Sequence, residues 1–202
     1  MSLKQHLGWR HVMIALAILF LITFKVFSDD PEIALVIGEP YEDMRQRSTA
    51  YISPALPGET WFSVPDSDTR LNFMDAQYGF VTPLARFFTV IYDNGLINSV
   101  RLSPQIEPLL FGDALKIVLD LQEQWHRTGW TPTRPDDFPP IADTLTWRDR
   151  LQRNSLSGKT FWNAHNKYQV MLGIRRFKDP NNPGDERYLI SLSVADVWVK
   201  PL

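Results

Sequence analysis

The chain has 202 residues, no cysteine and a formal net charge of −2. Without cysteine, disulfide bonds, a thiol nucleophile and cysteine-ligated zinc are all excluded. A nucleic-acid-binding domain is normally strongly basic, so this mildly acidic chain is not expected to have a nucleic-acid partner. Seven Trp, twelve Phe and six Tyr residues predict a rich hydrophobic core, and the length suits one domain after an N-terminal segment.

An unbroken apolar run occupies residues 12–24. Extended to residues 9–27 it covers about 19 residues, or nearly 30 Å of helix, which is enough to cross a bilayer. Trp9 and Arg10 lie before the run and Lys25 lies near its end, as membrane-interface residues do. The expected organisation is a cytoplasmic N-terminus (residues 1–11), a transmembrane signal anchor (residues 12–27), a linker (residues 28–40) and an extracytoplasmic domain (residues 41–202).

The charges beside the apolar run favour a cytoplasmic N-terminus, because Lys4 and Arg10 precede the run whereas Asp29 and Asp30 follow it. The expected location is the bacterial inner membrane, single-pass, with the C-terminal domain in the periplasm. A cleaved signal peptide is the alternative, since a basic start and about 13 apolar residues also fit that class. A buried core helix is a third interpretation. A lipoprotein is excluded because no cysteine is present to carry the lipid.

Residues 86–102 predict a β-hairpin. β-Branched and aromatic residues flank Asn94 and Gly95, a pair that tolerates the positive φ angles of the tight hairpin turns. On the second strand, Ser99 and Arg101 alternate with apolar residues, so one face should be buried and the other wet. Such a hairpin is unstable alone and should belong to a larger sheet.

Two helices are expected after the hairpin. The first should begin at Asp113 and end before Gly129, because apolar residues recur at three- and four-residue spacing between them. The second should begin at Thr146, which forms a capping box with Asp149, and run for about two turns.

The other elements are assigned from composition and from proline and glycine positions. We expect strands at residues 33–37, 61–64, 159–163, 167–177 and 187–199, a short helix at residues 40–48, and an extended, flexible proline-rich segment at residues 131–140. Regular β-α-β alternation is missing. The sequence therefore predicts an α+β fold, in which an antiparallel sheet carries two or three helices packed on one face.

The sequence contains no motif that predicts catalysis, a metal or a cofactor. His126 and His165 have no second ligand at metal-binding spacing, so they are better interpreted as a helix-end and a turn histidine. The paired carboxylates lie in expected loops, a linker or a helix start, where solvent exposure is the ordinary explanation. We expect no catalytic, cofactor-binding or metal-binding residues, and therefore no enzyme activity.

Aromatic and basic residues are frequent late in the chain, and this mixture is typical of recognition surfaces. The alternative is that the rings form the core and the cations face solvent. The candidate partner-binding residues are Trp130, Phe138, Arg148, Trp162, Tyr168, Arg175 and Arg176.

These features favour a membrane-anchored, extracytoplasmic protein-binding module, with the membrane and a protein of the cell envelope as partners. An inhibitor or immunity protein and an accessory subunit of an envelope complex fit equally well. The alternative is an extracytoplasmic hydrolase or glycan-processing enzyme whose site forms only in the fold. A ligand sensor is a third hypothesis, although about eleven cytoplasmic residues leave no room for an output domain.

Overall fold

The structure, a computed structural model, describes residues 30–153, 158–178, 184 and 186–200. The expected cytoplasmic N-terminus, the expected anchor and the interface residues Trp9, Arg10 and Lys25 lie outside the described residues. None of the helices in the described ranges combines the length and the apolar character needed to cross a membrane.

The fold is α+β with mostly antiparallel sheets, as expected. The larger of two sheets, here called the large sheet, has seven strands, of which all neighbours pair antiparallel. In spatial order they are β2 (Thr60–Ser63), β5 (Phe87–Asp93), β6 (Leu96–Ser103), β10 (Glu186–Ala195), β9 (Tyr168–Lys178), β8 (Gly158–Ala164) and β7 (Thr131–Pro132).

A second, small sheet joins the expected strand at residues 33–37 to two strands that the sequence did not predict. Its strand order is β1 (Glu32–Leu35), β3 (Arg70–Phe73) and β4 (Phe80–Val81). β1 and β3 pair in parallel, so this small sheet differs from the single antiparallel sheet that the sequence predicts. The connection between them contains a helix and β2, which is long enough for a parallel crossover. β1 also shows that the compact unit begins within the expected linker, at Pro31.

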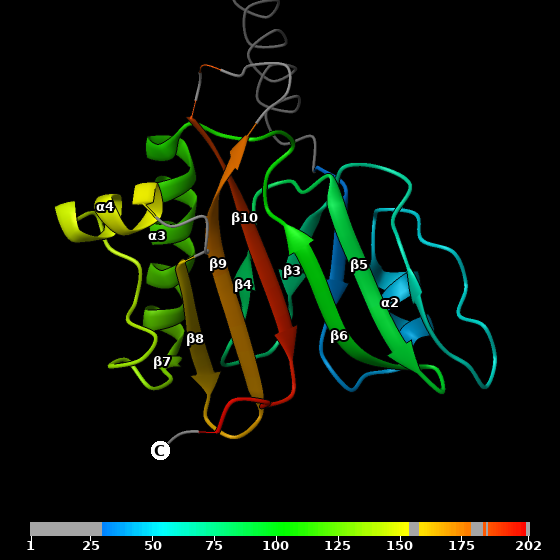
Figure 1. Ribbon diagram of the computed structural model, residues 1–202. Helices are drawn as coiled ribbons and strands as arrows, with labels where there is room; N and C mark the ends of the chain where they lie inside the picture. The colour runs from blue at the N-terminus through cyan, green and yellow to red at the C-terminus, as the bar shows by residue number, and fades with distance from the viewer. Residues whose placement is uncertain (1–29, 154–157, 179–183, 185, 201–202) are drawn as a thin grey trace, which may run out of the picture. The chain divides into compact units, whose positions relative to one another are not determined.

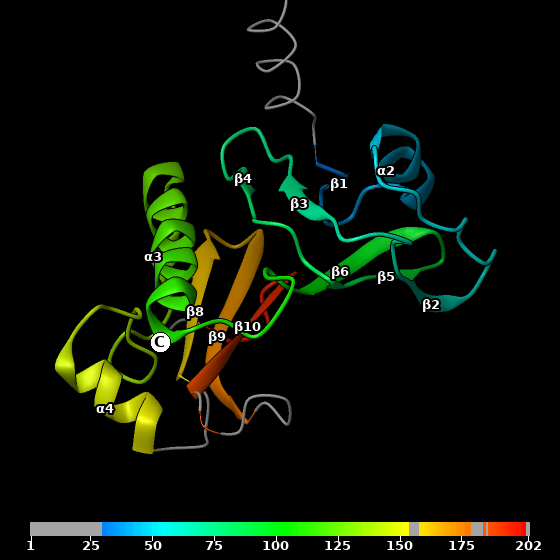
Figure 2. The ribbon, with the colours of Figure 1, turned by 90° about the horizontal axis from the view of Figure 1, so that it is seen from above.

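Three helices lie in the described part of the chain: α2 (Tyr41–Arg47), α3 (Phe111–Thr128) and α4 (Leu145–Arg153). α2 packs against β1, and α3 packs against β9, β10 and β4. Figure 2 shows α3 and the small sheet on the same side of the large sheet. α4 contacts that side too, because its Trp147 lies against Gly158, which pairs with the core residue Ile174.

The covered side of the large sheet is called its inner face. Side chains from alternate positions of the strands form cross-strand rows there, and those in the middle of the sheet are buried. The central row, here called the inner row, consists of the buried side chains of Val90, Val100, Val194, Val170 and Trp162. These side chains join one continuous core with α3, α4 and the small sheet.

The expected hairpin is confirmed as β5 and β6, with Asn94 at φ 48° and Gly95 at φ 77° in the turn. Two helix starts differ from the expectation. α3 begins at Phe111, two residues before Asp113, which lies in the first turn and pairs with Lys116. Helix α4 is capped by a different threonine: Thr144, whose hydroxyl accepts the N–H of Trp147, precedes Thr146.

Candidate binding surface

The side of the large sheet opposite the inner face is called the outer face, and it faces the viewer in Figure 1. Its central row, the outer row, is Thr89, Arg101, Ser193, Met171 and Phe161. A second row, toward the β5–β6 turn, is Ile91, Ser99, Ala195, Gln169 and Asn163. Arg101 is exposed, as the alternation in residues 99–102 predicts, whereas Ser99 and Phe161 are buried.

The cross-strand rows of the outer face carry positive charge, and Asp196, beyond the end of β10, is an acid that lines a hollow of this face. Arg101 lies in the outer row, while Lys159 and Arg175 lie opposite Gly173 and Leu189 in the flanking rows. All three cations are exposed, and none has an ion-pair partner among the described residues. The same rows contain no Asp or Glu in the described part of the chain.

Large apolar side chains are exposed where β2 ends the large sheet. Trp61 is 53% exposed and Phe62 47%, and Phe87, at the start of β5 and outside its pairing with β2, is 69% exposed. The rings of Trp61 and Phe62 stack with their centroids 5.3 Å apart, and Phe62 lies opposite Ile91 on β5. Single exposed apolar residues are ordinary on a protein surface, but a cluster next to unpaired cations is typical of an interaction site.

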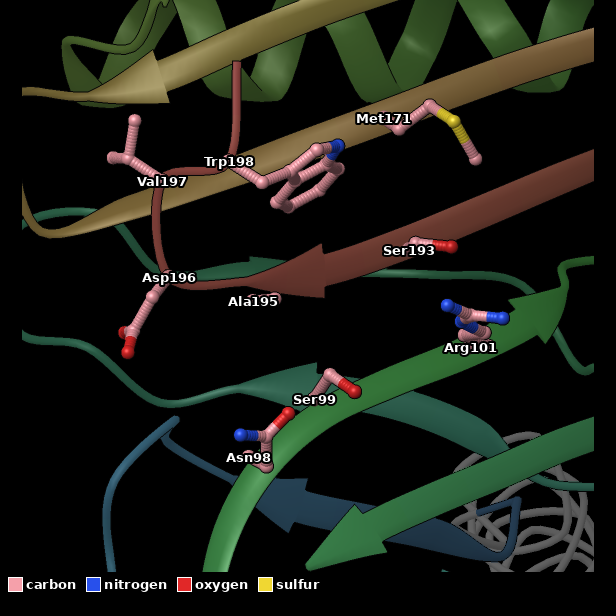
Figure 3. A pocket seen from close by; sticks show the side chains of 9 residues that line it. All are labelled: Asn98, Ser99, Arg101, Met171, Ser193, Ala195, Asp196, Val197 and Trp198. Carbon is pink, nitrogen blue, oxygen red and sulfur yellow. The ribbon is translucent and has the colours of Figure 1, made fainter. Parts of the chain in front are cut away.

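Two hollows on the outer face meet at Arg101. The first, of about 500 Å³, is shown in Figure 3 and is lined by residues of β6, β9, β10 and residues 196–198. The second, of about 450 Å³, is lined by Trp61 and Phe62 together with Thr89 and Ile91. Arg101 belongs to both.

Residues 196–200 return across the outer face and form one wall of the first hollow. Gln169, which is fully buried, holds them: its amide oxygen accepts the N–H of Val199 at 2.8 Å and its amide nitrogen donates to the Val199 carbonyl at 2.8 Å. Trp198 is thereby placed edge-to-face against Phe161, with centroids 6.2 Å apart. The position of Trp198 is thus set by side-chain hydrogen bonds rather than by a strand.

Three of the candidate partner-binding residues lie in the core. Trp130, Trp162 and Tyr168 are each less than 5% exposed and join a cluster of rings. The indole N–H of Trp130 donates to the carbonyl of Tyr78 at 3.1 Å. For these three, the structure supports the alternative in which the rings form the core, so they supply no ring face to a partner.

The other four candidates are not gathered into one surface. Arg148, on α4, pairs with Asp143, and Arg176 pairs with Glu186. Arg175 lies on the outer face. Phe138, half-buried in the proline-rich segment, packs edge-to-face on Phe161 with centroids 4.8 Å apart and so adjoins the outer face at its β8 edge.

The proline-rich segment, expected to be flexible, is held by hydrogen bonds to the sheet and to α3. Its Thr133 N–H donates to the carbonyl of Phe161 at 2.8 Å. Just beyond it, the buried Gln122 side chain donates to the Ile141 carbonyl and accepts the Ile141 N–H. These bonds fix both ends of the segment against the core.

Asp75 is an acid whose surroundings clearly lower its pKa. One oxygen accepts the N–H groups of Gln77 and Tyr78, and the other accepts the Lys167 ammonium at 2.6 Å and the Tyr168 hydroxyl at 3.2 Å. Burial alone would raise its pKa, but the hydrogen bonds from Lys167 and from the two backbone N–H groups outweigh burial and lower the pKa to about 2. A fully partnered, ionised carboxylate of this kind ties loops together and is unsuited to donate a proton.

Glu42, in the acid pair at the start of α2, is also held ionised. Hydrogen bonds from Arg45 and then Gln46 lower its pKa to about 2. His126 lies in the last turn of α3 and His165 in the β8–β9 turn, as expected. Within the ranges that the structure describes, no three His, Asp or Glu side chains gather as metal ligands would.

Four exposed aromatic residues were not among the candidate partner-binding residues that the sequence predicted: Trp61, Phe62, Phe87 and Trp198. The alternation along β6 correctly placed Arg101 on the wet face, and this was the usable signal. No family model, curated protein or solved structure matches the chain.

Proposed function

We propose that this chain is a protein-binding module, held at the extracytoplasmic side of a bacterial inner membrane by residues 12–27, and that its outer face binds a protein of the cell envelope. The observation that carries the proposal is that the exposed rings of Trp61 and Phe62 lie beside Arg101, which has no ion-pair partner among the described residues, on the sheet face opposite the helices. Trp, Tyr, Phe and Arg are the residues that dominate protein–protein interfaces.

The geometry favours binding over hydrolysis. The two hollows are shallow parts of a sheet face, and they are lined by apolar, hydroxyl and amide groups with Arg101 and Asp196. A glycan hydrolase needs a pair of carboxyl groups about 5 to 9.5 Å apart, one of them with a raised pKa. The two carboxylates with the clearest shifts, on Asp75 and Glu42, both have a lowered pKa instead.

Position-specific photo-crosslinking in intact cells tests the proposed surface. A photoreactive phenylalanine analogue is placed at Phe62 or Phe87 on the outer face, and at Leu145 on α4, which is 81% exposed and serves as the matched control. We expect the two outer-face positions to give the same discrete adduct and Leu145 to give none. An adduct of equal yield at Leu145, or none at Phe62 and Phe87, contradicts the proposal.

The membrane tether is tested separately by carbonate washing of membranes and by sequencing the N-terminus of the mature protein. We expect retention in the membrane and a start at Met1 or Ser2. A new N-terminus at Asp29 would show a cleaved signal peptide and refute the anchor, while leaving the binding surface unaffected.

A further inference from the structure

We propose that Arg101 binds the carboxylate of an acidic side chain on the partner protein, and that the two hollows beside it receive apolar side chains that flank this acid. The inference rests on the proposed function and specifies the chemistry of the partner. It starts from the position of Arg101, which is the one residue that lines both hollows.

Arg101 differs from most other arginines of the described chain in having no partner. Other guanidinium groups meet a carboxylate, as in Arg45–Glu42, Arg47–Glu39, Arg86–Asp68, Arg134–Asp137 and Arg148–Asp143. Asp196, the acid that lines the first hollow, lies at the opposite end from Arg101 (Figure 3). A guanidinium presents a planar set of donors that matches a carboxylate, so the unpaired group selects an anion.

Hydroxyl groups surround Arg101 and complete a site for an anion. Thr89 and Ser193 are its direct cross-strand neighbours, and Ser99 precedes it by two residues on the same face. Within the described residues, none of these three hydroxyls has a side-chain hydrogen-bond partner. A carboxylate has about four acceptor positions, and a single guanidinium does not fill them all. A nearby hydroxyl can donate to those that remain.

The walls of the hollows favour a protein over a membrane or a glycan. On one side of Arg101 lie Phe62 and Ile91, and on the other lie Met171 and Trp198. Lipid headgroups supply anions but no apolar side chains for two separate hollows. An acidic sugar would place hydroxyl groups against Ile91 and Met171, and these hydroxyl groups would lose their hydrogen bonds to water without gaining others.

Neighbouring cations add a broader electrostatic preference. Lys159 and Arg175 share the face with Arg101, and Asp196, the acid that lines the first hollow, lies at the end opposite to Arg101 (Figure 3). Complementary charge of this kind fixes the orientation of a partner and raises its association rate. The acidic residue is therefore expected at the centre of the partner's surface, between apolar residues.

Methyl NMR of the full chain in mild detergent tests the proposal, because the sequence contains only five Met residues. Met171 lines the first hollow, whereas Met74 is 45% exposed in the β3–β4 loop and reports non-specific effects. The probe is the blocked peptide acetyl-Leu-Ala-Glu-Ala-Leu-amide, and the matched control peptide has Gln in place of Glu. Vesicles of phosphatidylglycerol and short hyaluronan oligosaccharides form the two other arms.

We expect the Glu peptide to shift the Met171 methyl signal without shifting that of Met74. Its binding should be about tenfold weaker for Arg101→Gln, as expected for loss of one hydrogen bond to a charged group. Binding should be less than about twofold weaker for the control Arg127→Gln, since Arg127 is an exposed arginine of α3 and lies outside the outer face. The Met methyl spectrum of unbound Arg101→Gln should otherwise match that of the wild type, which shows that this variant folds.

Equal shifts with the Glu and Gln peptides, no shift with either, or a Met171 shift with only the vesicles or hyaluronan would overturn the proposal. These outcomes are distinct from failure of the proposed function. If Phe62 and Phe87 crosslink a partner but the peptides are not discriminated, the surface is correct and the role of Arg101 is wrong.

Discussion

The two faces of the large sheet are built from the same strands and differ in almost every physical property. The inner row consists of four valines and Trp162, all buried. The outer row, one residue away along each strand, contains Thr89, Arg101, Ser193 and Met171 and ends at Phe161. Strand alternation alone separates them.

This difference separates the residues that stabilise the fold from those that can bind a partner. α3, α4 and the small sheet cover the inner face, so its side chains contribute their full apolar burial to stability. The outer face keeps large rings and cations in solvent, where they add little to stability. We therefore expect substitutions on the two faces to separate stability from binding.

The largest expected contrast is between Trp162→Ala and Phe87→Ala. Trp162 is 4% exposed and packs on Trp125 with ring centroids 5.8 Å apart, so its loss should reduce the free energy of unfolding by about 3 to 5 kcal/mol. Phe87 is on the outer face, and its truncation should change this free energy by less than about 0.5 kcal/mol. Urea unfolding of the full chain in mild detergent measures both values, and equal losses would contradict the division between the faces.

Two glycines in adjacent strands sharpen the comparison at the backbone. A Cβ at Gly158 would lie 2.5 Å from a ring carbon of Trp147 on the inner side, so Gly158→Ala should cost about 1 to 3 kcal/mol through overpacking. A Cβ at Gly173 would lie 2.7 Å from the hydroxyl of Ser191, which can rotate away on the outer face. Gly173→Ala should therefore reduce the free energy of unfolding by less than about 1 kcal/mol. A larger loss for Gly173→Ala than for Gly158→Ala in urea unfolding would contradict the assignment of the inner face as the packed one.

The parts of the fold that the sequence predicted have local causes. Asn94 and Gly95 determine the hairpin turn by themselves, and the apolar stripe of α3 lies within one helix. The pairing within the small sheet has no such signal, because β4 has only two residues and β1 meets β3 through a parallel pairing distant in sequence. Short strands with distant partners acquire their structure from tertiary contacts.

The candidate site was only partly predictable for the same reason. Composition predicted a surface of rings and cations. Whether Trp162 or Phe161 points into the core depends on strand register, because a shift of one residue exchanges the two faces. Alternation did place Arg101 in solvent. That it has no partner depends on Thr89 and Ser193, which distant parts of the chain bring beside it.

A pH-dependent contrast is expected from Asp75, whose side chain is 8% exposed and packs beside the inner core. Its pKa is about 2 in the folded protein against an ordinary 3.8, so its contribution is fully present above about pH 5 and is lost as the pH falls from 4 to 2. Because Lys167 is largely exposed, we expect Asp75 to contribute at most about 1 to 2 kcal/mol to the free energy of unfolding. In urea unfolding, the stability difference between wild type and Asp75→Asn should narrow over that pH range, and a constant difference would contradict this role.

The smallest expected effect is on the stability of Arg101→Gln. Arg101 is exposed and has no ion-pair partner in the described chain, so removing its charge breaks no contact and should change the free energy of unfolding by less than about 0.5 kcal/mol. Urea unfolding at pH 7 measures this value beside Arg127→Gln. A loss above about 1 kcal/mol would mean that Arg101 supports the sheet, and weaker peptide binding would then report damage to the fold. A small change, combined with tenfold weaker binding, leaves direct contact with the anion as the explanation, because the outer face would have lost a ligand-binding group and nothing else.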